Sequence, residues 1–189
     1  MILRNQVQAM PCAPRAIVGR LRVVLRSPSG LVVARRQAHN AVLRSGAEML
    51  AAMFRGEAGA APTGFAVGLS DEPPAPPFDP TPPVVLRPDN TQGILRPAAA
   101  LAADAMTVSV LAEEMLVRVA VRATLPADAG VSPDGPEVAV DIAEACLGVL
   151  APDGQSLSRI YNRVVFDAVP KTALHELALF WEVDFPYGA

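Results

Sequence analysis

Apolar side chains recur at every second position in several parts of this chain, and that period of two limits the folds open to it. Successive side chains of a β-strand point to opposite faces, so the pattern predicts strands with one buried face. The clearest cases lie in residues 16–26, 116–124 and 174–185. In the last segment the expected buried core face comprises Leu177, Leu179, Trp181, Val183 and Phe185.

The remaining strand signals are shorter and are separated by residues typical of turns. Ser27–Gly30 divides residues 18–38 into an expected hairpin, and Val67 is the central core residue of a strand over 65–69. Further strands are expected at 107–111, 137–143, 146–150 and 161–166. About eight to ten short strands with no strand–helix alternation predict a mainly β fold, an antiparallel β-sandwich or barrel.

One short helix is expected at about residues 45–55. Ser45 and Glu48 have the spacing of a capping box, in which each side chain bonds the backbone N–H of the other residue. Gly56 stands where a glycine commonly follows a helix. The narrow apolar stripe predicts that the helix lies against one sheet, and it consists of Met49, Leu50, Met53 and Phe54.

Prolines set residues 71–92 apart from the strands. Proline lacks a backbone N–H and disfavours helix in the residue before it, so this segment is expected to be an extended, exposed loop. It is either a spacer, which we favour, or a strap across a neighbouring subunit. The expected interface residues of a strap are Pro73, Pro74, Pro76, Pro77 and Phe78, together with Phe180 on the outer face of the last strand.

Length and composition favour one folded domain. The chain has 189 residues, of which 51% are hydrophobic and 19% charged, and this is ample material for a packed core. We expect a single β-sandwich-like domain over 15–189, preceded by a flexible arm over 1–14 that has no periodic pattern. The net charge of −3 gives no general attraction to nucleic acid or anionic membranes, and no apolar run is long enough to span a bilayer.

The two cysteines bear on the compartment in which the chain is made. The first residues lack the apolar run of a signal peptide, so we expect synthesis in the cytosol. Cys12 and Cys146 lie far apart in the sequence. They can pair or stay free, and a reducing cytosol favours free thiols.

Candidate catalytic and metal-binding residues occur singly. His39 and His175 have no second ligand at zinc-site spacing, so we expect His39 to cap or pack at a strand–helix junction and His175 to face solvent. Glu113–Glu114 indicates a solvated turn, and Asp141 and Glu144 flank an expected break between two strands. We therefore expect no enzyme activity, no cofactor and no metal site.

Arginine supplies nearly all of the positive charge, and Lys171 is the only lysine. An arginine-rich face is expected on the first hairpin, from Arg20, Arg22, Arg26, Arg35 and Arg36. Such a face is a solvated surface, a docking site for an acidic partner or, least favoured, a contact for nucleic acid phosphates.

Short motifs in the C-terminal third are the most informative about function. Residues 144–149 are EACLGV, residues 157–166 are LSRIYNRVVF, and Lys171–Thr172 and LFWEVDF at 179–185 follow. The front half adds HNAV at 39–42 and FAVGLS at 65–70. This series resembles phage tail-associated structural proteins, the tail, baseplate and collar β-sandwich family of tailed phages and phage-like particles.

The resemblance implies a structural virion subunit of a phage tail, baseplate or neck. Its partners would be other virion structural proteins and copies of itself in a homo-oligomer, with no direct contact to nucleic acid or membrane. Its location would be the virion, after synthesis in the host bacterial cytoplasm. The alternative is an adhesion module that binds the host surface or glycans, since β-sandwiches host many unrelated binding functions.

Overall fold

The structure, a computed structural model, describes residues 16–76, 78–87, 89 and 92–188. The expected arm over 1–14, Cys12 and Pro77 lie outside these residues. Nine strands and one helix occur in the described part of the chain. They are β1 (Val18–Arg26), β2 (Val32–Val42), α1 (Arg44–Phe54), β3 (Gly64–Gly68), β4 (Ala98–Ala100), β5 (Met106–Leu111), β6 (Leu116–Leu125), β7 (Val140–Leu150), β8 (Leu157–Lys171) and β9 (Glu176–Pro186).

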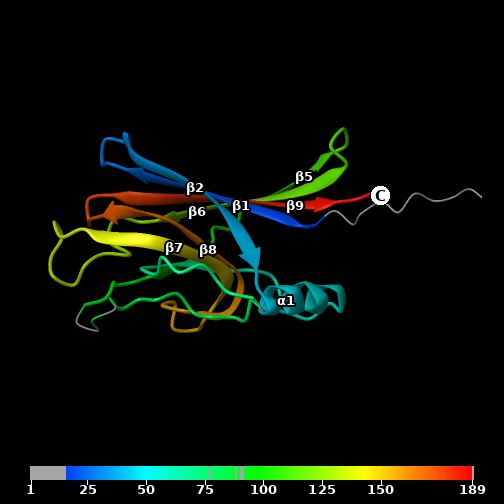
Figure 1. The fold of residues 1–189 in the computed structure, drawn as a ribbon, viewed down its shortest axis with the longest axis horizontal. Coiled ribbons are helices and arrows are strands. Elements are labelled where there is room, and N and C mark those ends of the chain that lie inside the picture. The colour runs from blue at the N-terminus through cyan, green and yellow to red at the C-terminus, as the bar shows by residue number, and fades with distance from the viewer. Residues whose placement is uncertain (1–15, 77, 88, 90–91, 189) are drawn as a thin grey trace, which may run out of the picture.

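The strands form one antiparallel sheet that curls until its two halves face each other. Their order is β4-β3-β7-β8-β2-β1-β9-β6-β5. Figure 1 shows β2, β1, β9, β6 and β5 in one layer, and β7 and β8 in a second layer with α1 at one end. The prediction of a mainly β sandwich or barrel with one short helix is therefore confirmed, in the form of a half-barrel.

Strand β2 carries the sheet from one layer to the other. Residues 32–40 pair with β1, whereas Ala41 and Val42 pair with Arg163 and Asn162 of β8. The hairpin expected over 18–38 is confirmed, but its second strand is longer than expected. Pairing with β8 holds the last residues of β2 in the sheet and leads the chain directly into α1.

The inner faces of the two layers form the core. Trp181 of β9 and Phe65 of β3 meet there, with ring centroids 6.3 Å apart and planes tilted by 59°. Burying a large apolar side chain contributes about 1.5–3 kcal/mol, so this contact is a main link between the layers. Of the expected core residues, Phe185 is partly buried, and the fully buried ones are Leu177, Leu179, Trp181, Val183 and Val67.

Helix α1 confirms the expected helix but not its expected cap. The residue before it, Leu43, makes no side-chain capping hydrogen bond. Ser45 lies inside the helix, and its hydroxyl donates to the backbone carbonyl of Ile160 on β8. The predicted capping box of Ser45 and Glu48 is therefore wrong, because packing on β8 takes the hydroxyl away from the helix's own N–H groups.

The C-terminal end of α1 follows the prediction. Gly56 has a φ of 71°, which suits glycine, and its N–H donates to the carbonyl of Met53 at 3.0 Å. The N–H of Glu57 donates to the carbonyl of Ala52 at 3.0 Å, which completes a Schellman motif. The predicted apolar stripe is only partly buried: Met49 is in the core, whereas Phe54 is 94% exposed.

Strand β7 runs without a break where the sequence predicts two strands divided near Glu144. The expected break is wrong, because the register with β8 shifts between Ile142 and Glu144 and a local irregularity takes up the extra residue. Asp141 is exposed and Glu144 is fully buried, so these two carboxylates lie in different environments.

Candidate functional site

Glu144 is a charged residue buried at the centre of β7. Its side chain is fully buried, and its Oε2 accepts a hydrogen bond from Nε of Arg163 on β8 at 2.6 Å. Its Oε1 accepts from the backbone N–H groups of Val84 at 2.7 Å and Ser70 at 3.2 Å. A buried charge without such partners costs several kcal/mol, so these contacts account for its position.

The same carboxylate closes the Pro-rich loop. Ser70 follows β3 closely and Val84 lies at the far end of residues 71–83, so one oxygen atom of Glu144 holds both ends. The N–H of Leu69 also donates to the carbonyl of Val84 at 2.8 Å. The described part of the loop is extended and mostly exposed, as expected, and Leu86 pairs with Gly93 in an isolated bridge.

The expected interface residues of the loop do not share one environment. The carbonyl of Phe78 accepts the backbone N–H of Arg44 at 3.0 Å, and Asp79 lies 3.2 Å from the Arg44 guanidinium. This part of the loop is therefore docked on the start of α1. Of the prolines before it that the structure describes, Pro73 and Pro76 are exposed and Pro74 is half-buried.

Arginines gather on the outer face of the layer β2-β1-β9-β6. This arginine face holds four of the expected residues and two from β6, and consists of Arg20, Arg22, Arg26, Arg35, Arg118 and Arg122. Arg36 was expected on it and is not, because it lies on the opposite side of β2 and donates to the carbonyls of Asp167 and Ala168. The sequence pattern missed the two β6 arginines because it did not give the strand order.

Two carboxylates of β9 neutralise one end of the arginine face. Asp184 accepts from Nε of Arg118 at 2.7 Å and from the Arg20 guanidinium at 2.6 Å. Glu182 lies 4.0 Å from Arg20 and 3.9 Å from Arg118. The hydrogen bond from Arg118 lowers the pKa of Asp184 against the opposing effect of burial. The same hydrogen bond raises the pKa of Arg118.

The middle of the face is cationic around one aromatic ring, between the Glu182 pair and Arg26, which stands opposite Glu176. Arg22, Phe180 and Arg122 stand directly opposite one another on β1, β9 and β6. The guanidinium carbon of Arg22 lies 4.6 Å from the centre of the Phe180 ring, in a cation–π contact. Both arginines are exposed, and neither has a carboxylate partner within the described part of the chain.

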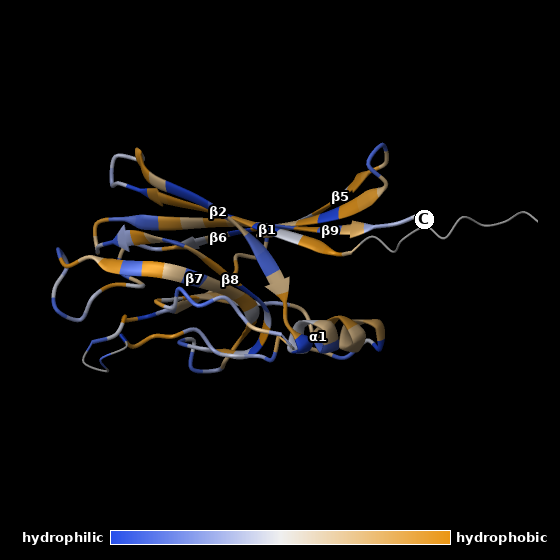
Figure 2. Ribbon diagram, viewed as in Figure 1, coloured by the Kyte–Doolittle hydropathy of each residue, from blue (hydrophilic) through white to orange (hydrophobic). Residues whose placement is uncertain are grey.

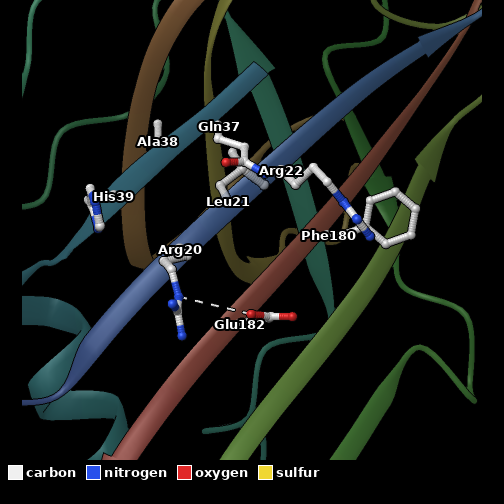
Figure 3. A pocket seen from close by; sticks show the side chains of 8 residues that line it. All are labelled: Arg20, Leu21, Arg22, Gln37, Ala38, His39, Phe180 and Glu182. Atoms are coloured by element: carbon white, nitrogen blue, oxygen red, sulfur yellow. Dashed lines mark ion pairs between the residues drawn. The ribbon is translucent and has the colours of Figure 1, made fainter. Parts of the chain in front are cut away.

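A shallow depression of ≈ 470 Å³ lies in this face between β2, β1 and β9. Figure 3 shows the side chains that line it, among them Arg20 and Arg22 from β1, Gln37 and His39 from β2, and Phe180 and Glu182 from β9. The predicted capping or packing position for His39 is wrong, because β2 extends past it to Val42 and the imidazole lines an open surface. The lining therefore combines guanidinium, amide and imidazole groups with one carboxylate, Glu182.

Strand β5 forms one edge of the sheet, and its apolar residues are open to solvent. Val108 is 67% and Val110 is 68% exposed. Its backbone pairs only with β6 among the described residues, whereas the opposite edge, β4, is short and begins with buried Ala98. Figure 2 shows β5 in the colour of hydrophobic residues, at the free margin of the upper layer. The sequence identified this strand but not its place at the edge.

Three further residues noted in the sequence, Lys171, His175 and Cys146, are buried or half-buried within the fold. Lys171 is fully buried and its Nζ donates to the carbonyl of Ala127 at 2.9 Å; burial lowers its pKa to about 8. His175 is half-buried and its Nδ1 lies 2.8 Å from the Thr172 hydroxyl, so the expected solvent exposure is only partial. Cys146 is buried, and desolvation raises the pKa of its thiol.

Comparison with known proteins leaves the chain without a family assignment. No model of a protein family matches it, and no curated protein and no solved structure does so either. Among the residues that the structure describes, no helix is long and apolar enough to cross a membrane. Within those same residues, no three histidine, cysteine, aspartate or glutamate side chains gather as possible metal ligands. The expected resemblance to phage tail proteins therefore rests on the sequence motifs alone and has no support from these comparisons.

Proposed function

We propose that this chain is a structural subunit that assembles by protein–protein contacts in a phage tail, baseplate or neck. The observation that carries the proposal is the open edge strand β5, with Val108 and Val110 largely exposed. An exposed apolar edge strand is a ready template for a strand of another chain, and folded proteins that stay monomeric usually block such edges. Here the edge carries no proline and no charged residue.

Two further groups of exposed apolar side chains favour a protein that assembles over one that stays monomeric. The tip of the β1–β2 hairpin exposes Leu31 at 70% and Val33 at 54%. Phe54 at the end of α1 is almost fully exposed, at 94%. Apolar side chains gathered at projecting points of a fold commonly mark protein contacts. The sequence motifs at 144–185 direct the proposal to phage tail structures in particular.

Quantitative mass spectrometry of purified particles from the producing strain tests this function. A constant copy number per particle, in a multiple of three or six, is the expected result for a subunit of a symmetric tail structure. Finding the protein only in the soluble part of the lysate would overturn the proposal. The glycan-binding alternative would then be examined on a glycan array with the purified protein.

A further inference from the structure

The arginine face has an excess of positive charge at a defined place. Asp184 and Glu182 balance Arg20 and Arg118, but one step along the strands the row Arg22–Phe180–Arg122 has no acidic member. Arg35 lies nearby, opposite Val24 on the same face, and is exposed. Exposed guanidinium groups beside an aromatic ring suit a partner that offers carboxylates together with flat apolar groups.

The chain itself presents a segment with that chemistry. Residues 71–76, Asp-Glu-Pro-Pro-Ala-Pro, carry two carboxylates and three prolines and no basic residue. Both acids and most of the prolines are exposed. Prolines hold the segment extended at low entropic cost, and extended proline-rich segments pack on aromatic side chains in many recognition domains. Its position is also fixed, since Glu144 holds the loop at Ser70 and Val84.

The segment and the arginine face lie on opposite sides of the molecule. Phe180 is on the outer face of β9, whereas its neighbour Trp181 points inward to Phe65 of β3 in the second layer. The Pro-rich loop follows β3 and is held by β7 of that second layer (Figure 1). A loop fixed at both ends on one layer does not reach the outer face of the other, so a contact between this segment and this face joins two copies.

We infer that the acidic, proline-rich segment 71–76 of one copy docks on the Arg22–Phe180–Arg122 row of the next copy. Asp71 and Glu72 pair with the two arginines, and the prolines pack beside the Phe180 ring. Because the two surfaces are different, the contact is head-to-tail, and repeated contacts of this kind close into a ring or extend into a filament. The inference deepens the proposed function and rests on it, since it names how copies of the subunit join.

Charge reversal on each surface tests the contact by sedimentation velocity at low and high micromolar concentration. The wild type should associate more at high concentration and less as salt is raised. D71K/E72K alone and R22E/R122E alone should each raise the dissociation constant by at least about tenfold. Their 1:1 mixture should regain association, because the intact loop fits the intact face and the reversed loop fits the reversed face. The fourfold variant, with all these changes in one chain, should regain self-association.

Matched variants separate this contact from a general effect of charge. E57K/E137K changes the net charge as D71K/E72K does but at exposed positions outside both surfaces, and it should associate like the wild type. A monomeric wild type at high micromolar concentration would overturn the inference, as would full association of both reversed variants. If both reversed variants still associated, copies would join through another surface, and the proposed structural role would stand without this contact. Mass spectrometry of particles tests that role independently.

Discussion

Glu144 and Arg163 form an ion pair of 2.6 Å between the central strands β7 and β8, and it is almost entirely shielded from water. The other oxygen of the carboxylate accepts hydrogen bonds from the backbone N–H groups of Ser70 and Val84. Glu144 therefore neutralises a buried charge in the second layer and also holds the two ends of the Pro-rich loop together. Removing its charge and removing its acceptor oxygens have different expected effects.

Replacement of Glu144 by glutamine should destabilise the fold by about 3–5 kcal/mol, because Arg163 is then left as an unpaired buried charge. The glutamine oxygen can still accept from Val84 and Ser70, so the loop should stay closed. Glu144→Leu removes the acceptor as well. Urea unfolding measures the first effect, and hydrogen exchange of the Ser70 and Val84 amides measures the second.

The double variant Glu144→Leu, Arg163→Met supplies the control for this pair. It leaves no charge in the core and should recover part of the stability lost in Glu144→Leu. Its Ser70 and Val84 amides should nevertheless exchange quickly. Equal exchange rates in the wild type and in Glu144→Leu would show that the carboxylate does not hold the loop.

The free energy of unfolding should increase as the pH rises from 8 to 10, because of the buried amine of Lys171. Burial lowers its folded-state pKa to about 8 from the ordinary 10.5, so in this interval the unfolded chain binds more protons than the folded one. The gain should approach about 2–3 kcal/mol by pH 10. Urea unfolding at several pH values measures it.

Lys171→Met is the control for that pH dependence, since it keeps the side-chain length without a titratable group. Its unfolding free energy should change little between pH 8 and 10. The measurement stops at pH 10 because burial raises the pKa of the Tyr161 hydroxyl, which opposes the lysine above that pH. An equal rise in both proteins would assign the effect to other groups.

Asp184 should contribute stability that is lost in acid. The hydrogen bond from Arg118 lowers its folded-state pKa, so the contribution is complete above the ordinary value of 3.8 and disappears as the pH falls through the lowered value. Asp184→Asn should cost about 1–2 kcal/mol at neutral pH. Below pH 4 the variant and the wild type should converge; parallel acid unfolding curves would contradict this account.

Gly46 should resist a substitution that helix propensity favours. Alanine is better than glycine by about 1 kcal/mol in a helix interior, yet a Cβ at this position would meet the backbone oxygen of Tyr161 at 2.0 Å. Gly46→Ala should therefore destabilise the protein by about 1–3 kcal/mol. Thermal unfolding measures this, with Ala47→Gly on the exposed side of α1 as the control at about 1 kcal/mol. A stabilised Gly46→Ala protein would mean that α1 is not pressed against β8.

Val108 and Val110 should matter for assembly and not for folding. Both are largely exposed, so V108K/V110K should change the unfolding free energy by no more than about 0.5 kcal/mol. The lysines should exclude the variant from particles, because charges block strand addition at an edge. Mass spectrometry of particles from a complemented strain measures incorporation. Q155K/S156K places the same charge in the exposed turn between β7 and β8, away from this edge, and equal loss of both variants would indicate an effect of charge alone.

Much of the secondary structure was predictable because its signals are local. The period-two segments give β1, β6 and β9, and the Gly56 conformation follows from a short-range signal. The exposed course of residues 71–76 follows from proline chemistry. Phe180 was singled out because it is an aromatic residue on the less apolar side of its strand.

The buried charges were not predicted from the sequence, although a signal for them is present in it. Glu144 stands between Ala143 and Ala145 in a run of apolar residues, and Arg163 lies on β8 between Ile160–Tyr161–Asn162 and Val164–Val165–Phe166. A charged residue within a continuous apolar strand has to find a partner, so each predicts some buried pair. Which residue is the partner depends on the register of β7 against β8.

The sequence by itself determined the helix, most of the strand segments and which side of each amphipathic strand is buried, because neighbouring residues set these through steric and hydrophobic periodicity. Tertiary structure alone decided the strand order, the Glu144–Arg163 pair, the open edge at β5 and the row Arg22–Phe180–Arg122. These depend on pairing between residues far apart in the chain. Arg22 and Phe180 meet only because β1 and β9 bury their apolar faces in the same layer. That choice is made by the packing of the whole core and is not contained in either strand.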